Sequence, residues 1–142
     1  MRLMRDRWDI LLVIAAGGAL GSLARWGLAQ ALSRPRGSFP LATLTENLSG
    51  AFALGLLMVW LTEVWPSARY LRPFLAVGVL GGYTTFSTYM LDTRDLLAAG
   101  RPGLAVGYLT GTVLAGLCAV FGGLLAGRSM LALARRLPRR RR

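Results

Sequence analysis

One stretch near the middle of the chain decides the fold, Gly81-Gly82-Tyr83-Thr84-Thr85-Phe86-Ser87-Thr88-Tyr89. Two glycines and four serine or threonine residues interrupt an otherwise uncharged apolar run from Pro73 to Leu91. This composition weakens a helix and frees backbone groups, which a bilayer tolerates only where the break is buried in protein or lines a wet cavity. Freed carbonyls would also suit a small, hard cation. We therefore favour a functional break over an intact helix whose hydroxyls bond back to the preceding turn.

Outward from this stretch, the chain contains four apolar segments, each with the roughly 20 mostly apolar residues that a bilayer-crossing helix needs. We place these spans at residues 10–32, 39–61, 73–98 and 102–127. Residues 1–128 then form one domain, and residues 129–142 form an arginine-rich tail. Because the connections are short, neighbouring helices should be antiparallel. The predicted fold class is an all-α integral membrane protein with four transmembrane helices and a break in the third.

The charge distribution agrees with this class. The 142 residues are 54% hydrophobic and 16% charged, and the formal net charge of +11 arises from arginine, since lysine is absent. A nucleic-acid partner is not expected, because such binding needs basic residues on a folded polar face. The arginines concentrate at both termini and between the second and third spans, while Arg34, Arg36 and Arg101 lie on the opposite side. By the positive-inside rule, both termini should be cytoplasmic.

Composition also excludes several chemistries. The absence of histidine rules out histidine-based acid–base catalysis and histidine metal sites. The single cysteine, Cys118, excludes an intrachain disulfide and a cysteine cluster, and we expect it to be a small core residue. The six acidic residues are scattered and form no catalytic pair, so we do not expect an enzyme.

Polar residues inside the second and fourth spans are functional candidates, because burying them unpaired is costly. Asn47 either serves function or makes an interhelical hydrogen bond that only supports packing. For Glu46 we favour simple solvation near the membrane interface. Tyr108 and Thr112 are four residues apart and share one helical face, so they form either a hydroxyl track or two local hydrogen bonds.

Glycines recur at helical spacing in three places, at Gly17 and Gly21, at Gly78 and Gly82, and at Gly103, Gly107 and Gly111. Small residues at this spacing let helix backbones approach closely in lipid. Packing within one chain and a seam between two chains explain the pattern equally well.

Three motifs together resemble the Fluc/CrcB family of fluoride channels, and the resemblance extends from the first to the fourth span. They are Gly17-Gly18-Ala19-Leu20-Gly21-Ser22-Leu23-Ala24-Arg25-Trp26, Ala42-Thr43-Leu44-Thr45-Glu46-Asn47-Leu48-Ser49-Gly50-Ala51-Phe52 and Gly81-Gly82-Tyr83-Thr84-Thr85-Phe86-Ser87-Thr88. The resemblance implies an antiparallel dimer of four-helix subunits with two pores along the interface. It also implies a multi-pass protein of the plasma membrane that exports fluoride passively and lowers its toxicity.

The same resemblance implies roles for individual residues. The fluoride pathway would be formed by Asn47, the ring edges of Phe86 and Tyr89, and the hydroxyls of Ser87, Thr88, Tyr108 and Thr112. A sodium ion at the dimer centre would be held by the backbone carbonyls of Gly81 and Thr84, and Arg25 would lie near a vestibule. The chain departs from the family pattern at Tyr89, which replaces a phenylalanine, at Glu46, which we expect to point away from the pore, and at Asp92, a shorter acid than usual.

Two other functions compete with a fluoride channel. A small multidrug-type exporter would need a carboxylate in the first span, and none lies between Ile10 and Leu32. A non-conducting subunit could instead assemble with partners or contact membrane lipids through the arginine tail. The arginine asymmetry leaves two assemblies open, an antiparallel homodimer and a heterodimer with a homologous subunit.

Overall fold

The computed structural model describes residues 2–33, 35 and 37–136, and these residues form only helices and their connections. The elements are α1 (Arg2–Ala31), α2 (Leu41–Glu63), the π-helix η1 (Pro73–Val79), α3 (Leu80–Tyr83), α4 (Phe86–Ala98) and α5 (Pro102–Arg136). The elements η1, α3 and α4 together make one interrupted rod. Within the described ranges, four helices are long and apolar enough to cross a membrane, as the sequence predicted.

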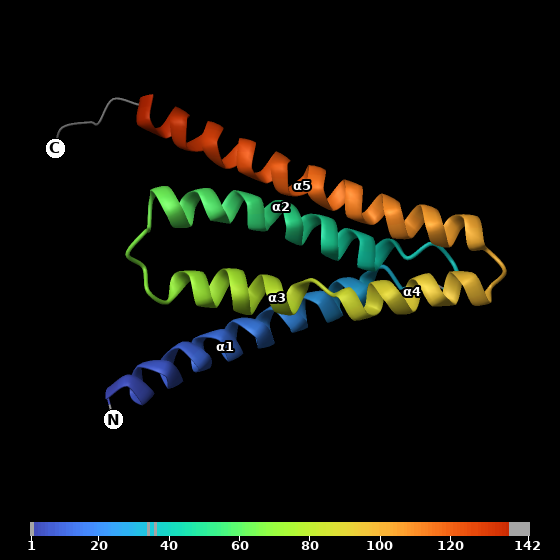
Figure 1. The fold of residues 1–142 in the computed structure, drawn as a ribbon, viewed down its shortest axis with the longest axis horizontal. Coiled ribbons are helices and arrows are strands. Elements are labelled where there is room, and N and C mark those ends of the chain that lie inside the picture. Colours follow the sequence, from blue (N-terminus) through green and yellow to red (C-terminus); the bar gives the residue numbers. More distant parts are fainter. Residues whose placement is uncertain (1, 34, 36, 137–142) are drawn as a thin grey trace.

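The rods pack side by side in a simple bundle (Figure 1). Helix α2 lies along α5, while α1 crosses η1 and α3. The start of α1, the connection from α2 to η1 and the end of α5 lie at one end of the bundle. The connections that lead into α2 and α5 lie at the other end. Most of the described arginines that lie outside the spans are therefore at the first of these two ends of the bundle.

Prolines and glycines set the helix ends. Pro40 precedes α2, Pro73 begins η1 and Pro102 begins α5, where a missing amide hydrogen does least harm. Gly37 and Gly100 have φ values of 76° and 72°, a left-handed conformation that favours glycine. Gly100 follows the end of α4 and lets the chain turn directly into α5.

The first two glycine pairs pack α1 against η1 and α3. A methyl group at Gly78 would lie 2.9 Å from the Cα of Gly17, and one at Gly21 would overlap the carbonyl of Val79. A methyl group at Gly82 would overlap the carbonyl of Gly18. These backbones approach so closely because neither helix carries a side chain at the crossing. Packing within the chain is therefore the correct interpretation of these pairs.

The third glycine series behaves differently. In the described part of the subunit, nothing lies within 4 Å of a methyl group placed at Gly103, Gly107 or Gly111. Intrachain packing is therefore the wrong interpretation for this series. Helix α5 packs on α2 through other glycines, because a methyl group at Gly55 or Gly123 would overlap the backbone of the opposite helix.

Large hydrophobic side chains are mostly exposed. Trp8, Trp26 and Phe121 are examples, whereas the buried cluster contains only Tyr89, Leu96, Ala105 and Tyr108. A soluble protein would bury such a surface, so these side chains face lipid or another subunit. Cys118 lies on this exposed surface of α5, and the expectation of a core cysteine is wrong.

The helices are longer than the predicted spans at two ends. Helix α1 begins at Arg2 rather than near residue 10, and α5 continues to Arg136 through the first half of the expected arginine tail. Residues 137–142 of that tail lie outside the described residues. Arginines can extend a transmembrane helix into the aqueous phase because their charged ends reach water.

Candidate ion pathway

The third rod is interrupted in the middle of its polar stretch. Helical geometry ends at Tyr83, Thr84 and Thr85 adopt extended conformations with ψ values of 156° and 127°, and α4 begins at Phe86. The hydroxyl of Thr85 caps the new helix by accepting a hydrogen bond from the amide of Thr88 at 3.2 Å. One helix therefore ends and a separately capped helix begins at the break, so the rod is interrupted and not merely bent.

Asn47 of α2 holds the break in place. Its Nδ2 donates to the carbonyl of Thr85 at 2.9 Å, and its Oδ1 accepts from the amide of Thr85 at 2.9 Å. The carboxamide thus replaces the hydrogen bond that the Thr85 amide loses at the break and adds one to the Thr85 carbonyl, which as the N-cap also begins α4. The second hydrogen on Nδ2 stays available as a donor at the break. The sequence analysis named Asn47 but not its partner.

The break leaves four backbone carbonyls without the amide that a continuous helix would supply, those of Gly81, Gly82, Tyr83 and Thr84. In a continuous helix, the amides of Thr85 and Thr88 would bond the carbonyls of Gly81 and Thr84. Here these amides bond Asn47 and the hydroxyl of Thr85, and no other backbone amide of the described chain takes their place. The two carbonyls predicted to hold a cation are therefore among the four that the break leaves without helical partners. Their donor chemistry fits sodium.

Aromatic rings extend from the break toward α5. The ring centroids of Phe86 and Tyr89 are 5.8 Å apart, and those of Tyr89 and Tyr108 are 5.3 Å apart. Phe39 meets Tyr108 edge-on at 5.9 Å. Phe86 is 74% exposed, whereas Tyr89 and Tyr108 are buried. The row therefore runs from the outer surface of the subunit into its interior.

The hydroxyl of Tyr89 is used within the subunit. It donates to the carbonyl of Leu109 on α5. It therefore ties α4 to α5.

The expected hydroxyl track forms two groups. The hydroxyls of Ser87 and Thr88 lie 3.3 and 3.0 Å from that of Thr85, so they belong to the break. The hydroxyls of Tyr108 and Thr112 lie one turn apart on α5, are buried, and have no hydrogen-bond partner within the described residues. Of the two interpretations of this pair, local hydrogen bonding is wrong.

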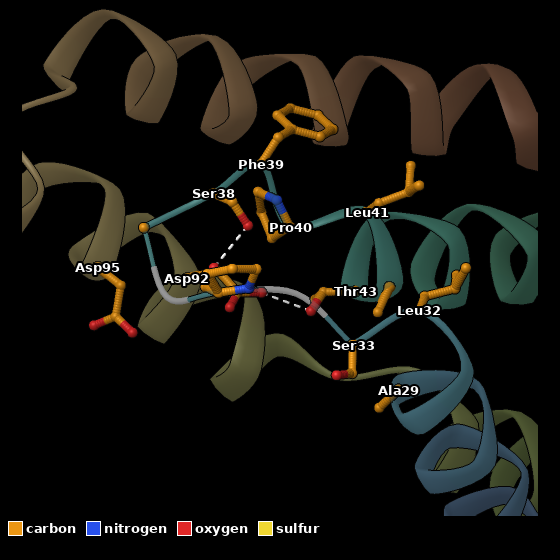
Figure 2. A pocket seen from close by; sticks show the side chains of 13 residues that line it. Ala29, Leu32, Ser33, Ser38, Phe39, Pro40, Leu41, Thr43, Asp92 and Asp95 are labelled. Carbon is orange, nitrogen blue, oxygen red and sulfur yellow. Dashed lines mark hydrogen bonds between the residues drawn. The ribbon is translucent and has the colours of Figure 1, made fainter.

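A polar pocket of about 280 Å³ opens where the connection to α2 meets α4 (Figure 2). It is lined by Phe39, Thr43, Asp92 and Asp95, among others, and the hydroxyl of Thr43 donates to Oδ2 of Asp92 at 2.6 Å. Sequence reasoning missed the role of Thr43. The signal was its position one turn before Asn47 on α2, which places both residues near one helical face.

Arg25 lies on α1 near the level of the break. Gly21, one turn earlier, packs against the start of the break at Tyr83. The Arg25 side chain is half-buried and forms no ion pair in the described part of the chain. A guanidinium in this position raises the electrostatic potential for an anion that approaches the break.

Glu46 is not solvated, and the expectation of a surface carboxylate is wrong. Its side chain is 2% exposed, and its Oε1 atom has no hydrogen-bond partner. The charged groups that act on it are Arg25 of α1 and Asp92 of α4. Sequence periodicity placed Glu46 away from Asn47 but could not show what packs on that side.

These features define a class. Four apolar helices, one of them interrupted by a break that carries amide, hydroxyl and aromatic groups, make a multi-pass membrane protein with polar groups inside a span. Residues 12–124 match the family model described as CrcB-like protein, Camphor Resistance (CrcB). The chain belongs to the CrcB family.

Relatives cover most of the chain. It is 50% identical over 127 residues to fluoride-specific ion channel FluC 2 of Nocardia farcinica, covering 89% of this chain and 91% of the relative. It is 45% identical over 121 residues to fluoride-specific ion channel FluC of Paracoccus denitrificans, covering 85% and 96%. It is also 49% identical over 133 residues to fluoride-specific ion channel FluC 3 of Streptomyces avermitilis. That match covers 94% of this chain and 64% of the relative.

Proposed function

We propose that this chain is a fluoride-specific ion channel through which fluoride leaves the cytoplasm passively. The observation that carries the proposal is the Asn47 clamp on the break at Thr85, which introduces polar groups into an otherwise apolar bundle. The relatives are named as fluoride-specific channels, and the family is not enzymatic. Export through such a channel would lower the toxicity of fluoride that enters acid-stressed cells as neutral HF.

The physical requirement is to replace the water that fluoride binds strongly. Amide and hydroxyl donors supply direct replacements, and the positive edge of an aromatic ring supplies a weaker one. The chain provides the free hydrogen of Asn47, the edges of Phe86 and Tyr89, and the unpartnered hydroxyls of Tyr108 and Thr112. Conduction also needs binding weak enough to release the ion, which such an array of modest donors allows.

The remaining assignments within the pathway follow the same chemistry. Ser87 and Thr88 contribute hydroxyls at the break, next to Thr85. The pocket at Thr43 and Asp92 forms one mouth of the pathway. Arg25 attracts anions toward a vestibule at the level of the break.

A sodium ion is proposed at the centre of the assembly, bound by the carbonyls of Gly81 and Thr84. Support comes from the loss of helical partners at both carbonyls. The ion would fix the two broken helices relative to each other. Replacing sodium with a large organic cation should then lower the thermal stability of the assembly, and an unchanged melting temperature would reject the site.

The assembly is proposed to be an antiparallel dimer in the plasma membrane. Phe86 is 74% exposed although its ring belongs to the proposed pathway, so a second subunit would complete the wall around it. The glycine series of α5 also has no partner within the subunit. We favour a homodimer over a heterodimer because the pathway residues are nearly complete in this chain. Lipids would cover the remaining apolar surface.

The proposal is tested by fluoride efflux from liposomes that contain the purified protein, with chloride as the control anion. Phe86→Ile should abolish efflux because it removes the ring edge, while the protein elutes with the same size as the parent. Phe121→Ile is the matched control, since Phe121 is also exposed but lies on α5 away from the break. Unchanged efflux in Phe86→Ile would reject the assignment of the pathway.

A further inference from the structure

An apolar groove of about 390 Å³ runs between α2 and the third rod. Ala53, Leu56 and Trp60 line it from α2, and Leu75 and Leu80 line it from the third rod. The groove does not belong to the proposed pathway, because these three residues of α2 lie about 120–180° around the helix from Asn47. It therefore opens on a different face of the subunit.

The π-helical geometry of η1 builds one wall of the groove. The amide of Leu80 bonds the carbonyl of Leu75, five residues earlier. In an α-helix, residues five positions apart lie about 140° apart around the axis and do not share a face. The wider turn of a π-helix brings Leu75 and Leu80 toward one side, and such segments are frequent at functional sites.

Two tryptophans lie where the groove reaches the end of α2. The amide of Trp65 donates to the carbonyl of Trp60 at 3.0 Å, and the centroids of the two rings are 5.7 Å apart. Tryptophan is enriched at the depth where acyl chains meet lipid headgroups. From Trp60 back to Ala53, the groove follows α2 for about 10 Å toward the middle of the span. An acyl chain has the same direction when its headgroup lies at the level of the tryptophans.

A basic pocket of about 450 Å³ continues the groove at Trp65, which lines both. This pocket lies at the connection from α2 to η1 (Figure 1). Arg69 and Arg72 line it, and its described lining contains no acidic residue. Arg69 is bound to Asp9 of α1 at 3.3 Å, whereas Arg72 is exposed and forms no ion pair in the described part of the chain. Guanidinium groups match the geometry of a phosphate.

We propose that the groove and the basic pocket together bind one anionic phospholipid, with an acyl chain in the groove and the phosphate at Arg72. The site complements such a lipid, because it is apolar along its depth and cationic at the headgroup level. The inference does not depend on the proposed channel function, since no residue of the proposed pathway lines either part.

Quenching of tryptophan fluorescence by lipids with brominated acyl chains tests the site. The reporter protein carries Trp8→Phe and Trp26→Phe, because these side chains are 62% and 65% exposed and any lipid would quench them. The two remaining indoles, of Trp60 and Trp65, line the groove.

The reporter is reconstituted in phosphatidylcholine vesicles that contain increasing amounts of brominated phosphatidylglycerol or brominated phosphatidylcholine. Half-maximal quenching should need about fivefold less of the anionic lipid, the selectivity expected of one arginine near a lipid surface.

Three substitutions in the reporter separate the parts of the site. Arg72→Gln should reduce the selectivity to less than about twofold. Arg128→Gln is its matched control and should keep the selectivity, since Arg128 is an exposed arginine at the same end of the bundle but lines neither part of the site. Ala53→Phe places a ring in the groove and should weaken quenching by both lipids. Gel filtration shows whether the variants assemble alike.

Equal quenching of the reporter by the two lipids would overturn the proposal, as would a selectivity that survives in Arg72→Gln. Equal loss of selectivity in Arg128→Gln would also overturn it, because that result indicates a general attraction of anionic lipid to the arginine-rich end. Little quenching by either lipid would refute it by showing that a second copy of the chain or another protein covers the groove. The expected selectivity in a protein that conducts no fluoride would support the lipid site and refute only the proposed channel function.

Discussion

At the scale of single residues, Asn47 determines the geometry of the break. Its carboxamide makes two hydrogen bonds to the backbone of Thr85. It takes the amide that would otherwise bond the Gly81 carbonyl, while the hydroxyl of Thr85 takes the Thr88 amide that would bond the Thr84 carbonyl. A packing role and a pathway role for Asn47 are therefore not alternatives. The same side chain shapes the break and leaves one hydrogen to donate to an ion.

We predict that Asn47→Ala lowers both stability and fluoride efflux. The amide of Thr85 loses its partner, and an unsatisfied buried group costs about 1–3 kcal/mol. Thermal unfolding in detergent and liposome efflux measure the two effects. Thr45→Val is the matched control, since the Thr45 hydroxyl only bonds the carbonyl of Leu41 in its own helix. Equal losses in the two variants would contradict the special role of Asn47.

Other residues show the limits of sequence reasoning at this scale. The polarity of Glu46 was evident, but its burial depends on how the other helices pack around α2. Cys118 was expected in the core because it lies in an apolar run, yet it faces outward. In a membrane protein, hydrophobicity does not distinguish the core from the lipid-facing surface. The Thr43–Asp92 hydrogen bond joins residues 49 positions apart, so no local pattern indicates it.

At the scale of elements, the four spans and the position of the break were predictable. Long apolar runs define the spans, and the glycine and hydroxyl content at residues 81–89 indicates the break. Glycine spacing predicted close packing but not which helices would meet. Close packing occurs within the chain at Gly17 and Gly78, whereas nothing in the described subunit packs on the α5 glycines at 103–111.

The crossing of α1 with η1 and α3 leads to a prediction at this scale. Gly21→Ala should destabilise the subunit by about 1–3 kcal/mol or more, because the new methyl group would overlap the backbone at Val79. Gly27→Ala on the same helix is the control, since nothing lies within 4 Å of its position and alanine favours a helix. Thermal unfolding should separate the two variants. A melting temperature of Gly21→Ala equal to that of Gly27→Ala would contradict the described crossing.

At the scale of the whole molecule, the distribution of arginines favours a single orientation in the membrane, whereas the proposed homodimer needs two. An antiparallel homodimer needs the chain to insert in both orientations, whereas the arginines concentrate at the end of the bundle that carries the termini. The nearly complete set of pathway residues favours the homodimer. The surface of the subunit agrees with an assembly, because Phe86 is largely exposed and the glycine series of α5 has nothing packed on it within the described residues.

We predict that a cysteine added at either terminus is labelled from both sides of the membrane. Cys118 is replaced by serine in these variants, because it is exposed and would react as well. Membrane-impermeant reagents added outside, or after permeabilisation, measure the two populations. Labelling from one side alone would exclude the dual-orientation homodimer and leave the heterodimer with an oppositely oriented relative.

The central claim is that the break held by Asn47 forms a route for fluoride, and anion efflux from liposomes containing the purified chain tests it most directly. We predict rapid fluoride efflux, little chloride efflux under the same conditions, and loss of fluoride efflux in Phe86→Ile but not in Phe121→Ile. Fluoride efflux no faster than from protein-free liposomes, or equal efflux of fluoride and chloride, would contradict the claim.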